Sequence, residues 1–148
     1  MQLKINHKSS SVPGAIIIPI AKQDSLEHAL SEIAKQTGVP TELLKEDFQA
    51  SHKEIHTLYI QDKEEGKRLF LLGLGENPRF AEVMAAFRHL AFKKKKILPE
   101  RIGVNFNFRN APKNPASWVE ASVNGLYLGR YDIGLYKTGE KTDCAFLK

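Results

Sequence analysis

This 148-residue chain has few of the features that cross-link a protein or hold it in a membrane. It has one cysteine, Cys144, which excludes an internal disulfide framework and a cysteine-based zinc site. Its longest apolar run, residues 15–20, contains Pro19 and is far too short to cross a bilayer. The opening MQLKINHKSS lacks the apolar core of a secretory signal. We therefore expect a cytoplasmic protein with no membrane partner.

The composition that remains is that of a folded domain. Hydrophobic residues make up 42% of the chain and charged residues 26%, which argues against disorder of the whole chain. A chain of this length is expected to form one domain that buries about 70% of the surface exposed when it is unfolded. The net charge of +5, from 22 basic and 17 acidic residues, favours solubility and leaves nucleic-acid binding open.

Hydrophobic periodicity predicts strands in alternation with helices. The expected strands are residues 1–6, 15–20, 54–61, 68–74 and 101–109, and the expected helices are residues 24–36, 41–45, 77–95 and 115 to about 126. This order predicts an α/β fold in three layers, with helices on both faces of a mixed sheet. The two middle strands would pair antiparallel across a charged turn, and the segment from residue 68 to residue 108 would form a strand–helix–strand crossover.

Particular residues are expected to begin and end these helices. Asp24 and Glu27 have the spacing of a capping box for the first helix, and Thr41 is expected to cap the second. Gly38 suits the left-handed position after the first helix. Asn77, with a proline directly after it, is expected to cap the third.

One pair of histidines has a spacing found in metal sites. His52 and His56 are four residues apart, so both could lie on one face of a helix or strand. The zincin pattern requires a glutamate directly after the first histidine, but Lys53 stands there. No set of carboxylates accompanies the pair, and Cys144 has no base near it in the sequence. We expect neither a metal site nor a catalytic residue.

The GLGE segment at residues 73–76 lies between an expected strand and an expected helix, which is the arrangement of a phosphate-binding turn. The dinucleotide fingerprint would need a third glycine where Pro78 stands. Glu76 also places negative charge where a phosphate would lie. We favour a tight strand-to-helix turn, with a nucleotide or ADP-ribose site as the weaker alternative.

A run of four lysines, Lys93, Lys94, Lys95 and Lys96, forms a local cluster of positive charge. Four phosphate contacts would give a log–log salt slope of about −3.6 on duplex DNA. Cations at the end of a helix also interact favourably with its dipole, by about 0.3–1 kcal/mol each. We favour a solvated helix end and keep nucleic-acid contact as the alternative.

Aromatic residues are frequent near the end of the chain and could stack on a ligand. They are Trp118, Tyr127, Tyr131 and Tyr136. Trp118 shares a helical stripe with small residues that include Gly125, so we favour core packing for it. The segment from Trp118 to Lys137 begins as a helix, passes through Gly125 and Gly129 and ends in an aromatic-rich run, and it is interpreted as the exit from this domain toward another.

The second half of the chain resembles the N-terminal domain of the leucine aminopeptidase (cytosol aminopeptidase) family. The resemblance is carried by LFLLGLGE at residues 69–76, IGVNF at residues 102–106 and, above all, VEASVNGLYLGRYDIGLYKT at residues 119–138. In that family a helix with Glu, Gly and Leu leads into Leu-Gly-x-Tyr and then Tyr-Lys. The matching residues are Glu120, Gly125, Leu126, Leu128, Gly129, Tyr131, Tyr136 and Lys137. The first half matches only in the order of its elements.

The resemblance implies a macro-domain-like fold over residues 1–138 and the start of a linker at residues 139–148. In the family a C-terminal domain holds two divalent metals, zinc or manganese, through lysine, aspartate and glutamate, and carries an Asn-Thr-Asp-Ala-Glu-Gly-Arg motif. That motif is absent from this sequence, so the resemblance implies a non-catalytic domain and no catalytic residue is carried over. The implied partners are the catalytic domain and the other subunits of a homo-oligomer, a hexamer. The implied roles are assembly and substrate access, and some bacterial members also bind DNA.

Overall fold

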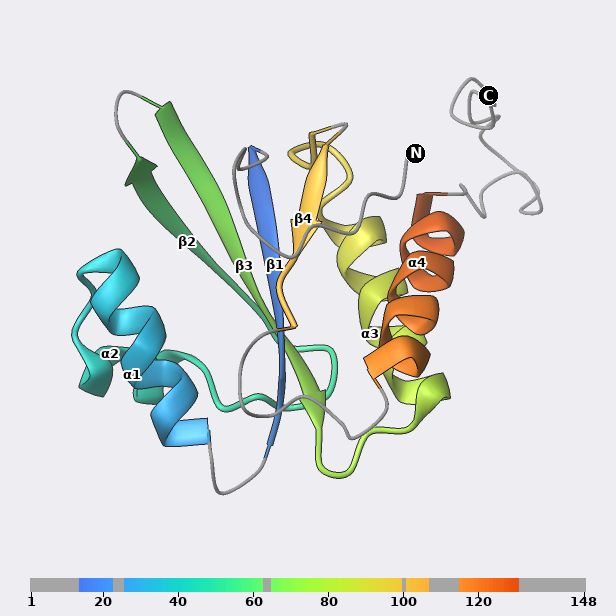
Figure 1. Ribbon diagram of the computed structural model, residues 1–148, viewed down its shortest axis with the longest axis horizontal. Coiled ribbons are helices and arrows are strands. Elements are labelled where there is room, and N and C mark those ends of the chain that lie inside the picture. The colour runs from blue at the N-terminus through green and yellow to red at the C-terminus, as the bar shows by residue number, and fades with distance from the viewer. Residues whose placement is uncertain (1–13, 23–25, 63–64, 100, 107–114, 131–148) are drawn as a thin grey trace, which may run out of the picture.

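Four strands form one mixed sheet in the computed structural model, which describes residues 14–22, 26–62, 65–99, 101–106 and 115–130. The elements of these residues, in chain order, are β1 (Ala15–Ala21), α1 (Leu26–Thr37), α2 (Thr41–Asp47), β2 (Ile55–Asp62), β3 (Glu65–Gly75), α3 (Phe80–Lys93), β4 (Ile102–Val104) and α4 (Pro115–Arg130). Figure 1 shows the sheet between the pair α1 and α2 and the pair α3 and α4. The predicted α/β fold in three layers is confirmed.

The order of strands in the sheet is β2-β3-β1-β4. β1 runs parallel to both β3 and β4, while β2 and β3 pair antiparallel, as predicted. The unit β3–α3–β4 therefore joins two parallel strands that have β1 between them. The backbone O of Ile17 accepts a hydrogen bond from Asn105 N at 2.9 Å. The backbone N–H and C=O groups of alternate residues of β1 therefore point toward β4. The backbone nitrogen of Pro19 points the same way but lies beyond Ile17, the last residue of β1 that pairs with β4. The N–H group that proline lacks therefore removes no hydrogen bond from the sheet.

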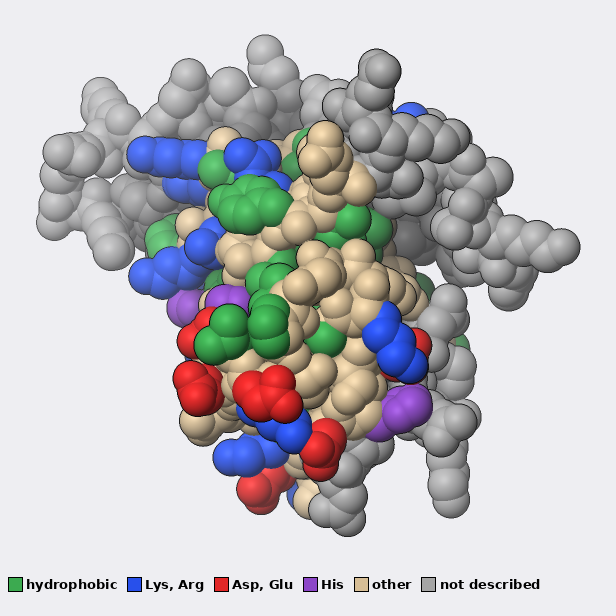
Figure 2. Space-filling view, turned by 90° about the vertical axis from the view of Figure 1, so that its left-hand side faces the viewer, with side chains coloured by type: hydrophobic (Ala, Val, Ile, Leu, Met, Phe, Trp, Pro, Cys, Tyr) green, Lys and Arg blue, Asp and Glu red, His purple; other side chains and the backbone are tan. Residues whose placement is uncertain are grey.

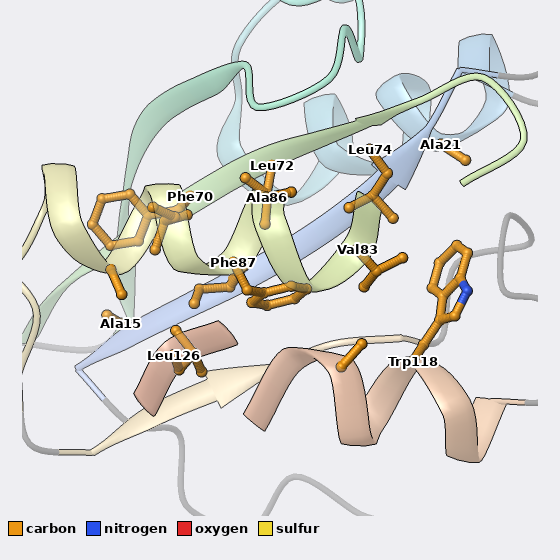
Figure 3. Packing of buried hydrophobic residues seen from close by; sticks show 14 residues of the cluster. Ala15, Ala21, Phe70, Leu72, Leu74, Val83, Ala86, Phe87, Trp118 and Leu126 are labelled. Atoms are coloured by element: carbon orange, nitrogen blue, oxygen red, sulfur yellow. The ribbon is translucent and has the colours of Figure 1, made fainter. Parts of the chain in front are cut away.

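Each face of the sheet has its own hydrophobic core, because successive side chains of a strand point to opposite faces. On the α1 and α2 side, Ile18 and Ile20 pack with Leu30, Ile33 and Phe48. The core on the α3 and α4 side is formed by Ala15, Ile17, Ala21, Phe70, Leu72, Leu74, Val83, Ala86, Phe87, Leu90, Ala91, Trp118, Ala121 and Leu126. Figure 3 shows the second core.

The ends of α1 and α2 agree with the sequence prediction in part. Gly38 follows α1 with a left-handed φ of 75°, as predicted, and its N–H donates to Ala34 O at 2.8 Å. The prediction for Thr41 is wrong, because Thr41 is already helical and Pro40 occupies the capping position. Asp24 lies outside the described residues.

The start of α3 was also predicted wrongly. Its capping position is Arg79, whose N–H donates to Glu82 Oε2 at 3.1 Å, and the helix begins at Phe80. Asn77 has a left-handed φ of 45° and belongs to the turn that reverses the chain after β3. A cap requires an extended backbone, which this conformation excludes.

Two further boundaries differ from expectation. The expected strand over residues 101–109 is reduced to Ile102–Val104, and residues 107–109 lie outside the described part of the chain. The last helix continues to Arg130 instead of ending near Leu126. The expected strand at residues 1–6 and the expected linker at residues 139–148 also fall outside the described ranges.

Candidate functional site

The turn after β3 is covered by a second segment, residues 50–54, which crosses the end of that strand. Gly73 N donates to Glu54 O at 2.7 Å, and Lys53 N donates to Gly73 O at 3.0 Å. Gly75 N donates to Ala50 O at 3.0 Å. The glycine N–H groups that a phosphate would need are therefore already used within the protein.

Steric contact explains why glycines stand in this turn. A Cβ on Gly73 would lie 2.0 Å from Ser51 O. Gly75 has a φ of 78°, and a Cβ there would lie 3.2 Å from His52 Cβ. The glycines serve close chain packing and a left-handed backbone, so the interpretation as a tight strand-to-helix turn is confirmed.

The two candidate metal-ligating histidines have different surroundings. His52 lies in the turn before β2, whereas His56 lies within β2. The Nε2 of His52 donates to Glu82 O in α3 at 3.0 Å, since a carbonyl oxygen can only accept. Among the residues that the structure describes, no group of three or more His, Cys, Asp and Glu could hold a metal ion. Cys144 lies outside these residues.

Folding brings a third histidine, His89 of α3, close to this turn. Burial lowers the pKa of His89 below its ordinary value, and the charges of Lys53, Lys93 and His52 lower it further. Sequence analysis missed this grouping, because no local pattern indicates that residues 52 and 53 pack near the middle of α3.

The predicted lysine cluster lies where α3 ends. Lys93 is the last helical residue, and Lys94 N donates to Leu90 O at 2.9 Å. Lys95 Nζ lies 5.5 Å from the centroid of the Phe92 ring, which is within cation–π range. Lys96 is exposed. These features confirm the predicted solvated helix end, while nucleic-acid contact stays a prediction.

The opposite side of the molecule is more acidic. Figure 2 views the molecule from the α1 and α2 side and shows acidic side chains gathered on the lower part of that face. The acidic residues of the two helices are Glu27, Glu32, Glu42, Glu46 and Asp47. Glu27 is hydrogen-bonded to Lys45, and this bond together with the lysine charge lowers the pKa of the Glu27 carboxyl. The positive charge at the end of α3 is therefore separated from the acidic face by the sheet.

Two glycines of α4 allow it to contact α3 directly. A Cβ on Gly125 would lie 2.4 Å from Met84 O, and a Cβ on Gly129 would lie 2.4 Å from Arg88 O. Figure 3 shows Trp118 and Leu126 pointing from α4 into the core. Trp118 is 6% exposed, so its predicted core position is confirmed.

The first part of the segment from Trp118 to Lys137 therefore does not lead out of the domain. As far as Arg130 it is a helix packed on α3, and Tyr127 is an exposed residue within that helix. Tyr131 and Tyr136 lie outside the described residues. Gly125 and Gly129, which lie within this segment, form a close contact between α4 and α3.

This arrangement can be compared with known proteins. A profile described as the cytosol aminopeptidase family, N-terminal domain, matches residues 17–140, which include the glycine turn and both α3 and α4. The chain belongs to the cytosol aminopeptidase family. The resemblance inferred from the motifs of the second half is confirmed, and the profile extends it into the first half.

A curated relative of the family, a probable cytosol aminopeptidase of Chloroherpeton thalassium (strain ATCC 35110 / GB-78), is 33% identical over 131 residues. The match covers 84% of this chain and 25% of the relative, so the chain spans about a quarter of that protein. The solved structure of the bottromycin maturation enzyme BotP in complex with Mn has a TM-score of 0.55 at 14% identity. It matches 84% of this chain and 24% of that chain, and it supports the fold alone. No helix of the described residues is both long and apolar enough to cross a membrane.

Proposed function

We propose that this chain acts as the non-catalytic N-terminal domain of a leucyl aminopeptidase and serves in subunit assembly and substrate access. The observation that carries the proposal is the family match over residues 17–140, which corresponds to the N-terminal domain and to about a quarter of the relative. The proposal includes the macro-domain-like fold, the cytoplasmic location and a hexameric parent.

The proposal places peptide hydrolysis in a catalytic C-terminal domain that acts as the partner of this one. In the proposed parent, two divalent metals would supply a metal-bound nucleophile and polarise the peptide carbonyl. The described residues of this chain do not fit such a centre, because they contain no cluster of three or more potential ligands.

A domain exchange tests the role in assembly and access. The relative of Chloroherpeton thalassium would be produced intact, without its N-terminal domain, and with that domain replaced by this chain. We expect the exchanged enzyme to have the oligomeric mass of the intact one and the same preference between short and long peptides. A folded, active exchange enzyme that behaves like the truncated enzyme in both measurements would refute the proposal.

A second candidate, nucleic-acid binding, rests on the four lysines Lys93 to Lys96 at the end of α3. Lys93, Lys95 and Lys96 are exposed, Lys94 is half-buried, and Phe92 beside them is also exposed. Fluorescence anisotropy with duplex DNA at two salt concentrations tests it. Replacement of all four lysines by alanine should abolish binding and its salt dependence, and unchanged affinity would reject this site.

The third possibility, an ADP-ribose or nucleotide site at residues 73–76, is disfavoured by the structure. The N–H groups of Gly73 and Gly75 are bonded within the protein. Calorimetry with ADP-ribose at millimolar concentration tests it, and binding heat that persists after Lys53 and Lys93 are both replaced by methionine would support a site at this turn.

A further inference from the structure

A group of positively charged and titratable side chains from two separate segments gathers on one face of α3. The hydrogen bond from His52 Nε2 to Glu82 O, 3.0 Å long, holds the turn at residues 51–54 against the first turns of that helix. His89 and Lys93 follow Glu82 about two and three helical turns later, on the same face. Lys53 comes from the turn and is close enough to His89 for its charge to act on the imidazole. We call His52, Lys53, His89 and Lys93 the basic cluster.

Two carboxylates close to the basic cluster in sequence, Glu54 and Glu82, accept hydrogen bonds from backbone N–H groups. Glu54 accepts hydrogen bonds from Gln49 N at 2.9 Å and from Ser51 N at 3.2 Å. Glu82 accepts from Arg79 N at the start of α3. The ion pairs seen in the described part of the chain, Glu32–Lys35 and Glu27–Lys45, belong to α1 and α2. Within that part of the chain, no carboxylate forms an ion pair with Lys53 or Lys93.

The backbone of the turn is fixed in place before any ligand binds. Ala50 and Lys53 have left-handed φ values of 58° and 68°, which residues with a Cβ rarely adopt. The bonds of Lys53 N to Gly73 O and of Gly75 N to Ala50 O hold the turn on the end of β3. Lys53 is therefore positioned by the fold, and its charge is not simply carried by a flexible loop.

We propose that the basic cluster is a binding site for a polyvalent anion of the phosphate class, such as a diphosphate group. Lys53 and Lys93 are exposed, and the half-buried His89 lies one helical turn before Lys93 on α3. An anion with several negative oxygens would supply a counter-charge to these two lysines, neither of which forms an ion pair within the described residues. The site uses no residue of α4 and is independent of the proposed aminopeptidase function.

His89 makes this binding dependent on pH. The charged groups that act on His89 are Lys53 and His52 from the turn and Lys93 from α3. Because the cations disfavour the imidazolium, a bound anion restores it and raises the pKa of His89. For an anion of unchanged charge, binding therefore takes up protons and tightens as the pH falls through the range in which His89 titrates, by about tenfold for each unit of pKa change.

Nuclear magnetic resonance of the histidine rings in the full 148-residue chain provides the test. The pH titration of His89 would be recorded with and without inorganic pyrophosphate, at constant ionic strength and in the presence of a chelator. We expect pyrophosphate to raise the pKa of His89 and to leave the titration of His28, in α1, unchanged. An unchanged His89 titration at saturating pyrophosphate, or equal shifts at both histidines, would overturn the proposal.

Two charge-matched variants separate a site from general attraction. K53M/K93M removes two charges from the basic cluster, and K35M/K45M removes two from the α1 and α2 side. Pyrophosphate affinity at pH 6.5 should fall at least tenfold in the first and less than twofold in the second, with thermal unfolding confirming that both fold. Equal losses in the two variants would overturn the proposal.

A second ligand distinguishes the possible sources of the anion. A nucleoside diphosphate bound as tightly as pyrophosphate would support recognition of the phosphates alone, and tighter binding would support a nucleotide as the source. Binding of duplex DNA without binding of either diphosphate would contradict the proposed site.

Discussion

Single glycines decide how closely the elements of this domain approach one another. Because Gly73 has no Cβ, the segment at residues 50–54 can lie directly against it. Gly125 and Gly129 allow α4 to approach α3 in the same way. The sequence identified these positions, but it could not tell a turn from a close contact, because the atoms that exclude a Cβ come from distant parts of the chain. Gly38 was predictable, since its left-handed conformation follows from local helix geometry.

Replacement of Gly125 by alanine tests the contact between α3 and α4. Alanine would gain about 1 kcal/mol in helix propensity, but its Cβ would lie 2.4 Å from Met84 O and 2.8 Å from Phe87 Cβ. Overpacking against such atoms costs about 1–3 kcal/mol, so we expect a net loss of stability in urea unfolding. Asn124→Ala, at an exposed position of the same helix, should change stability by less than about 0.5 kcal/mol. A Gly125→Ala variant more stable than the natural chain would contradict the contact.

A second pair of variants tests the turn above β3. Gly73→Ala places a Cβ 2.0 Å from Ser51 O, whereas Gly66→Ala, in the same strand, meets nothing within 4 Å. We expect Gly73→Ala to lose at least about 1–3 kcal/mol of unfolding free energy. Gly66→Ala should be neutral or stabilising by about 0.5–1 kcal/mol, because glycine is entropically costly in a strand. Similar melting temperatures for both variants would argue against the crossing segment.

The ion pair of Glu27 and Lys45 predicts a pH effect with a definite sign. Its hydrogen bond and charge lower the pKa of Glu27 in the folded state. The associated stabilisation is therefore present above the unfolded-state pKa and is lost as the pH falls through the folded-state pKa. An NMR titration should show the lowered pKa, and Lys45→Met should return it toward the ordinary value, while Lys35→Met should not. Identical titrations in Lys45→Met and the natural chain would exclude the pair.

At the scale of elements, the periodic segments were predictable and their ends were not. The apolar stripes of α1 and α3 and the alternation in β2 identify these elements without tertiary information. The sequence prediction begins α3 three residues too early, because Asn77 and Pro78 belong to the turn after β3. β4 is shorter than its alternating pattern, and α4 is longer than its glycines suggest, because pairing and packing outweigh local propensity.

Hydrogen exchange tests the length of α4. If the helix continues to Arg130, the amides of Gly129 and Arg130 are bonded to carbonyls four residues earlier in the helix. They should exchange much more slowly than free peptide amides, with less protection in the Gly125→Ala variant. Exchange at the free-peptide rate in the natural chain would show that the helix ends near Leu126.

At the scale of the whole molecule, the sequence predicted the layers and the family, but not the surface. The order of strands and helices fixes three layers, and the motifs from residue 69 onward identify the family. The basic cluster joins residues 52 and 53 to residues 89 and 93, a proximity that arises only when the segment over β3 packs on α3. Surface chemistry of this kind depends on tertiary contacts, which the amino-acid sequence alone does not show.

The most direct test of whether this chain is a non-catalytic domain is a hydrolysis assay with leucine p-nitroanilide. The purified chain would be measured with added manganese or zinc, beside a full-length family member under the same conditions, after thermal unfolding shows that the chain is folded. We predict no metal-dependent release of p-nitroaniline above the buffer rate by this chain, because the chain matches the N-terminal domain of the family and the proposal assigns hydrolysis to the other domain. Turnover that co-purifies with the chain, requires the metal and is abolished by a chelator would contradict the account.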